Sequence, residues 1–233
     1  MLPAASQLPD PFELRDHQIA IELPGAHCRF TTAAAGDVRE PAVLAGLCGD
    51  GTTRPLRLLG ARQVHGSGVH LIEPEEHAAG IEADALLCVT PGVAPFVRSA
   101  DCVPLLISAG RAVAAVHAGW RGLRDGVIAA AVGRLRELAP GATLHVAIGP
   151  AAGPCCYRVG DDVHAVFAAR GQDLRAGANL DLRGVARAQL TELGVSAIHD
   201  CGVCTICSDN PRMHSYRRDG EGSGRQGAFI WCS

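Results

Sequence analysis

Residues 97–123 read VRSADCVPLLISAGRAVAAVHAGWRGL, and this stretch determines both the fold class and the expected place of the chemistry. The segment Ala112–Val116 is a short apolar run with a glycine on either side, which predicts a buried strand covered on both faces. His117 follows at the carboxyl end of that strand, and Cys102 lies next to Asp101 earlier in the stretch. Ligands of layered α/β proteins bind where loops converge at strand ends. We therefore expect the functional site around His117 and Cys102.

The segments on both sides alternate between strand and helix patterns. Apolar residues recur at helical spacing from Leu123 to Leu138 and stop at Pro140-Gly141, which predicts an amphipathic helix. Two further helices are predicted, one capped by Asp161 or Asp162 and one over 179–193, whereas 31–53 is either a loop with a short helix near 40–47 or a lid. Strands are predicted over 57–64, 69–72, 82–89 and 143–148, with one or two edge strands over 17–30. This alternation indicates an α/β fold.

Length and composition favour one globular domain. A chain of 233 residues suits a single domain over 1–233, in which residues 1–16 form a polar lead-in. The formal net charge of -3 gives no electrostatic reason to expect nucleic acid as a partner. The 21 basic residues are arginines, whose planar donor groups suit phosphate and carboxylate, so arginines near strand ends are of interest.

The cysteines and the apolar segments predict where in the cell the protein is located. The chain has ten cysteines, but its N-terminal segment lacks the apolar core of a signal peptide, so we expect reduced thiols and a cytoplasmic protein. Charged residues interrupt every apolar stretch before it reaches the roughly 20 residues of a transmembrane helix. No membrane partner is therefore expected.

Three residues at strand-to-loop junctions, His65, Cys102 and His117, form a candidate metal site. Imidazole and thiolate are ligands that zinc takes readily, and three protein ligands with a vacant fourth position are typical of catalytic zinc. The spacing is wide and irregular, and taken alone it favours two core histidines and a small buried thiol.

Two further motifs lie near the end of the sequence. The two-residue gaps in Cys201-Gly202-Val203-Cys204-Thr205-Ile206-Cys207 match the first three ligands of a bacterial ferredoxin cluster, but the fourth cysteine is missing, because residue 211 is proline. The pattern thus favours a turn with buried thiols over an iron–sulfur or structural zinc site. The basic, glycine-rich close, with Arg217, Arg218 and Arg225, is either an anion site or a solvated loop.

Nine short motifs follow one another along the chain: Arg62-Gln63-Val64-His65, Ala100-Asp101-Cys102-Val103-Pro104, His117-Ala118-Gly119-Trp120-Arg121-Gly122, Ile148-Gly149-Pro150, Cys156-Tyr157, Asp181-Leu182, Cys204-Thr205, Ser215-Tyr216-Arg217-Arg218 and Gly224-Arg225-Gln226. In this order they resemble the YfiH family, whose members have been labelled laccase-domain or multicopper polyphenol oxidase proteins. The resemblance runs from about residue 57 to 230.

The resemblance implies a single-domain, four-layer α/β/β/α fold with mixed sheets. It also implies Zn²⁺ held by His65, Cys102 and His117, with Cu²⁺ as a substitute, and phosphorolysis of purine nucleosides. The partners would be a purine nucleoside and phosphate. The family usually has glutamate after Cys-Tyr where this chain has Arg158, and the N-terminal part is shortened and altered, so the substrate range is open.

Roles can be assigned as hypotheses. We expect Arg62, Arg217 and Arg225 to bind substrate, Arg121 to contact phosphate or ribose, and Asp101 to transfer a proton. Adenosine deaminase activity is a further expectation, because a zinc site can activate water for attack on an amino-bearing purine carbon.

Two other functions remain open, one enzymatic and one not. A cysteine hydrolase would use Cys102 as nucleophile and His117 as base, and a role in editing peptidoglycan precursors has been assigned within the family. A nucleotide-binding regulator, which would bind purines tightly without turnover, is the third hypothesis. Polyphenol oxidase activity would be adventitious, because a multicopper oxidase needs ligands for about four coppers and none of the ten histidines forms a His-x-His pair.

Overall fold

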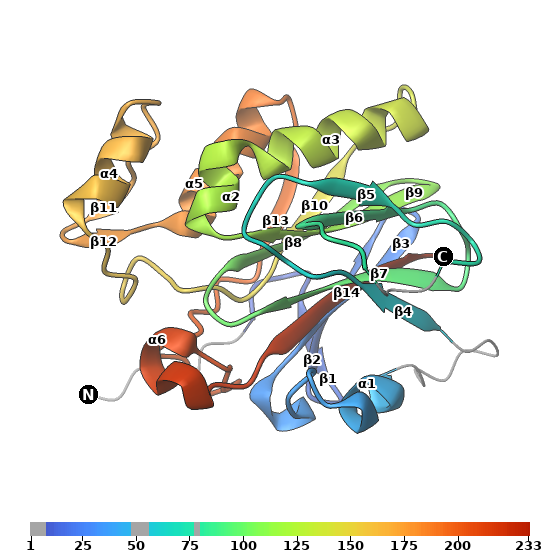
Figure 1. Cartoon of the computed structure of the whole chain (residues 1–233), viewed down its shortest axis with the longest axis horizontal. Helices are drawn as coiled ribbons and strands as arrows, with labels where there is room; N and C mark the ends of the chain where they lie inside the picture. The colour runs from blue at the N-terminus through green and yellow to red at the C-terminus, as the bar shows by residue number, and fades with distance from the viewer. Residues whose placement is uncertain (1–7, 48–55, 77–79) are drawn as a thin grey trace.

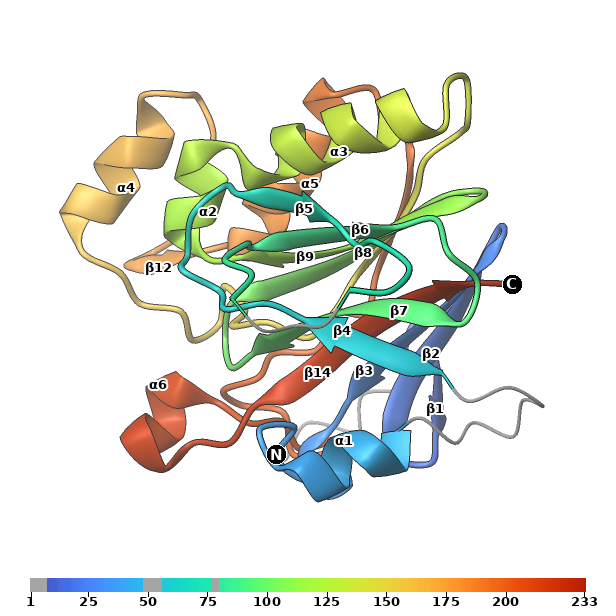
Figure 2. The same ribbon diagram turned by 45° about the vertical axis from the view of Figure 1, so that its right-hand side comes forward.

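The computed structural model describes residues 8–47, 56–76 and 80–233. Two six-stranded sheets pack face to face, and helices cover their outer sides, as Figures 1 and 2 show from two directions. These four layers confirm the predicted α/β/β/α architecture. None of the helices in the described ranges is long and apolar enough to cross a membrane.

The sheet that carries His117 has the strand order β13-β10-β8-β9-β6-β5. Its strands are β5 (Val69–Leu71), β6 (Ala85–Cys88), β8 (Val103–Ala109), β9 (Ala112–Ala118), β10 (His145–Ile148) and β13 (Ala197–Asp200). The central strands β8 and β9 are buried at every position, which confirms the buried strand predicted at Ala112–Val116, whereas β8 was not predicted. They form an antiparallel hairpin, which pairs Val103 with Ala118 and Pro104 with His117. The residue before β8 therefore lies beside the last residues of β9, which brings Cys102 to His117.

The second sheet has the order β1-β2-β3-β14-β7-β4. Its strands are β1 (Glu13–Arg15), β2 (Gln18–Leu23), β3 (Ala26–Thr31), β4 (Arg57–Gly60), β7 (Val93–Ser99) and β14 (Gln226–Cys232). The strands predicted over 17–30 are present as β2 and β3, but their predicted edge position is wrong, because β2 also pairs with β1 and β3 also pairs with β14. The predicted lead-in is shorter than expected, since Glu13–Arg15 already belongs to the sheet. A small hairpin of β11 (Arg175–Ala176) and β12 (Asn179–Leu180) lies outside both sheets.

Helices cover both outer faces. On the His117 sheet lie α2 (Trp120–Asp125), α3 (Val127–Leu138) and α5 (Leu182–Glu192), while α4 (Asp161–Ala168) lies further out (Figure 1). The helix predicted from Leu123 is split, because Gly126 adopts a left-handed backbone with φ of 83°. On the other sheet, α1 (Pro41–Leu47) packs near Phe96, Phe229 and Trp231, which supports the short-helix alternative for this segment. The short α6 (Tyr216–Asp219) precedes β14, and two 3₁₀ turns cover Ala33–Ala35 and Gly220–Gly222.

The core has two main parts. One lies between the His117 sheet and helices α2, α3 and α5, and includes Leu105, Val116, Leu135 and Leu190. The other lies between the two sheets, and includes Phe30, Leu106, Val113 and Ile230. The alternation of Leu105 and Leu106 between these clusters follows from the two-residue period of a strand. The segment from Ser99 to Val103 crosses from one sheet to the other, and Asp101 makes this crossing with a φ of 89°.

Candidate metal centre and cavity

The structure brings His65, Cys102 and His117 together. One nitrogen of each ring and the Cys102 sulfur lie within 4.8 Å of one another. His65 lies in the loop after β4, and Cys102 lies in the segment that connects β7 of one sheet to β8 of the other. His117 is the second-last residue of β9. The rings of His65 and His117 meet edge to face, with centroids 4.9 Å apart. The grouping agrees with the predicted ligand set, while the role as metal ligands stays a prediction.

Asp84 orients two of these three residues, and the sequence reasoning missed it. Its carboxylate is fully buried, and Oδ1 accepts a hydrogen bond from His117 Nδ1 at 2.8 Å. The carboxylate also accepts the backbone N–H groups of Val64, His65 and Gly66 at 3.2, 3.0 and 2.8 Å. These bonds hold the tight turn in which His65 adopts a φ of 60°. An acid at the start of an otherwise apolar strand was the available signal, because a buried carboxylate needs partners.

The charges of this group depend on one another. Burial raises the pKa of the Cys102 thiol, but the charge of His117 and hydrogen bonds from both histidines more than offset it, and the pKa falls to about 6. Burial lowers the pKa of His117, whereas the charge of Cys102 and the bond to Asp84 outweigh it and raise the pKa to about 9. Without a metal ion, each group thus favours the charged form of the other, the thiolate of Cys102 and the protonated ring of His117.

The donor set fits a zinc ion. Because Nδ1 of His117 is bonded to Asp84, Nε2 is the nitrogen that remains for a metal, in the carboxylate–histidine arrangement common around zinc. Gly119 leaves the space that the group needs, since a Cβ there would lie 3.1 Å from Cys102 Sγ and 3.2 Å from His65 Cδ2. Two imidazoles and one thiolate, with an open side toward a cavity, are typical of a catalytic rather than a structural zinc site.

That open side faces a cavity of about 460 Å³, which is within the usual range for small-molecule sites. Every residue predicted to act in the site lines this cavity: His65, Cys102 and His117 as ligands, Asp101 and Arg121 as catalytic residues, and Arg62, Arg217 and Arg225 as substrate contacts. The structure thus brings all of them together, although it does not test their roles. Arg39 and Arg98, which the sequence reasoning missed, also line the cavity.

The arginines differ in how they are engaged. Arg62 contacts Glu82, and Arg39 pairs with Asp37. Among the described residues, Arg98, Arg121 and Arg217 have no carboxylate partner within ion-pair distance, and the same holds for Arg225. Arg121 lies over the Trp120 ring at 4.5 Å and Arg217 over the Tyr157 ring at 4.7 Å. Their positive charge is therefore available to an anionic ligand.

Asp101 is held by its own hydrogen bonds. The side chain is 5% exposed, Oδ1 accepts the Thr205 hydroxyl at 2.6 Å and Oδ2 accepts the Arg217 backbone N–H at 2.7 Å. These bonds connect the crossing between the sheets to the start of α6. The contacts that the structure gives Asp101 thus position the cavity wall, whereas the predicted proton transfer remains untested. Arg218 points elsewhere, and its guanidinium donates to the carbonyls of Thr205, Ile206 and Met213.

Residues 45–233 match the sequence family described as multi-copper polyphenol oxidoreductase laccase. The chain is 40% identical over 180 residues to a purine nucleoside phosphorylase of Pseudomonas aeruginosa, with 72% of each chain covered. It is 34% identical over 218 residues to the purine nucleoside phosphorylase YfiH of Escherichia coli, with 89% of this chain and 84% of that chain covered.

Solved structures agree with these relatives. The fold matches that of the Bacillus licheniformis hypothetical protein YfiH, with a TM-score of 0.83, 26% identity and coverage of 97% of this chain and 100% of that chain. YlmD of Geobacillus stearothermophilus matches with a TM-score of 0.82, 27% identity and coverage of 96% and 99%. These matches confirm the resemblance drawn from the motifs, and the chain belongs to the laccase-domain family that includes the YfiH proteins.

Proposed function

We propose that this protein is a zinc-dependent purine nucleoside phosphorylase. One observation carries the proposal: the His65, Cys102 and His117 group opens onto a cavity whose arginines include four with no carboxylate partner among the described residues. A cavity of this charge suits phosphate, and its aromatic residues Trp120, Tyr157 and Tyr216 suit a flat purine. The relatives named purine nucleoside phosphorylase support the same activity.

Phosphorolysis places clear demands on the cavity. An oxygen of phosphate bonds to C1′ of the ribose while the bond from C1′ to the purine nitrogen breaks, and the departing purine takes up a proton. We assign Arg121, Arg62 and one of Arg217 and Arg225 to phosphate or ribose, because guanidinium groups form paired hydrogen bonds with phosphate oxygens. Asp101 is assigned to the proton transfer. A zinc ion held by His65, Cys102 and His117 would supply Lewis-acid assistance beside the bound substrate.

The test is phosphate-dependent release of free base and ribose 1-phosphate from inosine and adenosine, using purified protein of measured zinc content. Sulfate in place of phosphate is the control, since it offers the same shape but cannot yield ribose 1-phosphate. Ammonia release from adenosine, measured in the same samples, tests the proposed deaminase activity separately. No ribose 1-phosphate at any zinc loading would overturn the proposal.

A second candidate is the cysteine hydrolase, with peptidoglycan precursors as the expected substrates. One observation favours it: Asp84, His117 and Cys102 form a chain of orienting acid, imidazole and thiol with a lowered pKa, which resembles an activated nucleophile. Iodoacetamide distinguishes the two activities. A zinc-bound thiolate is protected when zinc is added, whereas a catalytic nucleophile is alkylated at the same rate with and without zinc.

Multicopper oxidase activity is not part of the proposal. Among residues 8–47, 56–76 and 80–233, His65 and His117 are the only histidines that lie in a group of three or more potential metal ligands. This number of imidazoles is far below what about four coppers require. A single copper in place of zinc at His65, Cys102 and His117 is the form of copper binding that these residues support.

A further inference from the structure

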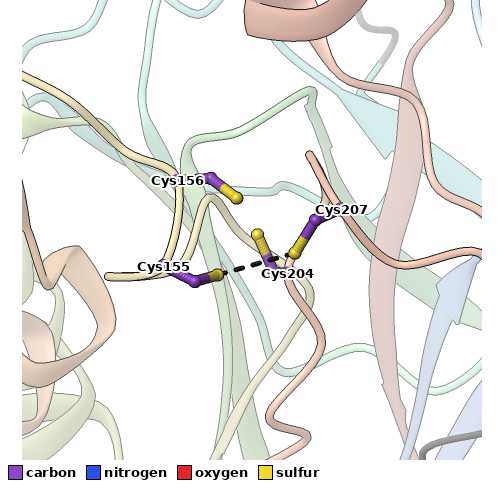
Figure 3. A group of neighbouring side chains, drawn as sticks. All are labelled: Cys155, Cys156, Cys204 and Cys207. Carbon is purple, nitrogen blue, oxygen red and sulfur yellow. Dashed lines mark hydrogen bonds between the residues drawn. The ribbon is translucent and has the colours of Figure 1, made fainter. Parts of the chain in front are cut away.

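Four cysteines from two distant segments form a second group, next in sequence to Tyr157 and Thr205 and distinct from the group of His65, Cys102 and His117. Cys155 and Cys156 lie in the turn that follows β10, and Cys204 and Cys207 lie in the irregular segment after β13. Their sulfur atoms all lie within 4.8 Å of one another. Figure 3 shows the four side chains converging from the two segments. The sulfurs of Cys155 and Cys207 are 3.6 Å apart.

The sulfur spacing suits one metal ion. A zinc–sulfur bond of about 2.3 Å places the sulfurs of a tetrahedral site about 3.8 Å apart, close to the separation of Cys155 and Cys207. The same separation is far beyond the roughly 2.05 Å of a disulfide bond. Four cysteines without an open position are the donor set of structural zinc sites.

The backbone around the cysteines is arranged to bring the two segments together. Ala151 and Cys204 form a parallel bridge, in which Ala151 N–H donates to Val203 O and Thr205 N–H donates to Ala151 O. Gly153 permits the approach, since a Cβ there would lie 3.2 Å from Cys155 Sγ and 3.2 Å from Cys204 Cβ.

The sulfur of Cys204 also accepts the Gly153 backbone N–H at 3.2 Å. Backbone N–H groups directed at sulfur stabilise negative charge on a thiolate, which is the form that binds metal. Side-chain exposure leaves a route for the ion, because Cys155 and Cys207 are exposed while Cys204 is buried.

We propose that Cys155, Cys156, Cys204 and Cys207 bind one structural Zn²⁺, at a site separate from the one proposed at His65, Cys102 and His117. The expectation that residues 201–207 form only a turn with buried thiols is thereby replaced. The missing ligands come from Cys155 and Cys156, which lie about 50 positions away in the sequence. Cys201 takes no part, since it is buried between the two sheets.

Such an ion would brace one wall of the cavity. Tyr157, next to Cys156, lies under the Arg217 guanidinium, and Thr205, next to Cys204, donates its hydroxyl to Asp101. An ion bound by both cysteine pairs would therefore hold Tyr157 and Thr205 in place. These two residues contact Arg217 and Asp101, which are assigned to the reaction. The inference does not depend on the proposed function, because the four cysteines would bind their ion whether or not the site at His65, Cys102 and His117 is occupied.

The first experiment counts zinc in the full-length protein, expressed and purified without chelators, by elemental analysis. The wild-type protein is expected to hold two equivalents and the Cys204→Ser/Cys207→Ser variant one. Cys201→Ala is the matched control, as a cysteine of the same segment outside the group, and it should keep two. Retention of both equivalents by the double variant would overturn the proposal, and so would a Cys155–Cys207 disulfide in freshly purified wild-type protein.

The second experiment uses Co²⁺ in place of zinc, and it remains informative if the double variant fails to fold. Thiolate-to-cobalt absorption grows with the number of cobalt–sulfur bonds. In the Cys102→Ser protein, the other site has lost its one thiolate, so strong absorption of a tetrahedral four-thiolate site should persist. Its absence there would refute the second site. If instead the site at His65, Cys102 and His117 does not bind metal, wild-type protein would hold one equivalent with the four-thiolate spectrum.

Discussion

Replacement of Asp84 by asparagine is the sharpest test of how the first metal site is held. The substitution keeps the size of the side chain and removes its charge, so no cavity is created. Each carboxylate oxygen accepts two N–H groups: His65 and His117 Nδ1 donate to Oδ1, and Val64 and Gly66 donate to Oδ2. Asparagine has only one oxygen, and its NH₂ group must therefore face two donors in either orientation.

Each orientation weakens zinc binding for a different reason. If the amide oxygen replaces Oδ1, the N–H groups of Val64 and Gly66 lose their acceptor, at a cost of roughly 1–3 kcal/mol each, and the turn that places His65 loosens. If it replaces Oδ2, the NH₂ group faces His117 Nδ1, and the ring proton must move to Nε2, the nitrogen assigned to the metal. Loss of such a supporting carboxylate typically lowers metal affinity by about 10–100-fold, or about 1.4–2.7 kcal/mol.

The affinity is measured by zinc competition with a chromophoric chelator. The Cys204→Ser/Cys207→Ser background restricts the titration to the site at His65, Cys102 and His117. Asp173→Asn is the matched control, because Asp173 accepts His164 Nδ1 at 2.7 Å in a similar pair away from the metal residues. A folded Asp84→Asn protein that binds zinc within threefold of its parent would refute the assigned role.

Four further predictions concern Cys102, Gly119, Arg121 and Asp37. Cys102→Ser should lose most zinc and activity together, with partial recovery in excess zinc; normal zinc content without activity would instead identify a nucleophile. Gly119→Ala places a methyl group about 3 Å from the Cys102 sulfur and should lower zinc affinity by roughly tenfold, measured by the same chelator competition. Arg121→Ala should raise the phosphate KM about tenfold or more, since a hydrogen bond to a charged group contributes roughly 1.5–3 kcal/mol, while the surface change Arg134→Ala should leave it unaltered. Burial raises the pKa of Asp37, but hydrogen bonds from Arg39 and the Arg225 backbone outweigh it and lower the pKa to about 2. The stability from Asp37, about 2 kcal/mol at most, should thus be present above pH ~4 and disappear as the pH falls toward 2, and urea unfolding of wild type and Asp37→Asn should converge over that range.

The fold was predictable where the sequence pattern is regular. The apolar run Ala112–Val116 indicated the buried strand β9, and the helical spacing after Leu123 indicated α3. The strand patterns of β7 and β8 were not recognised, because the stretch around residues 97–123 was interpreted through its reactive residues. The strand β14 was not recognised because it ends a segment rich in glycine and cysteine. Gly126 did not reveal the break between α2 and α3, because a glycine within a helix pattern often has no structural effect.

The site was predictable mainly through motifs. Spacing alone favoured buried core residues for His65, Cys102 and His117, and the resemblance to the family supplied the grouping. Asp84 escaped notice because its four hydrogen bonds come from a turn and a strand that meet only in the folded chain. Arg39 escaped for the same reason, since it reaches the cavity from a segment distant from the recognised motifs.

The position of β14 also bears on how the chain folds during synthesis. This strand lies between β3, some 200 residues earlier, and β7, so the sheet cannot be completed before residues 226–232 have left the ribosome. Until then β3 and β7 each expose an unpaired, largely apolar edge, and strands in that state are prone to pair with other chains. The sheet is therefore completed only when β14 pairs with two strands that were synthesised long before it.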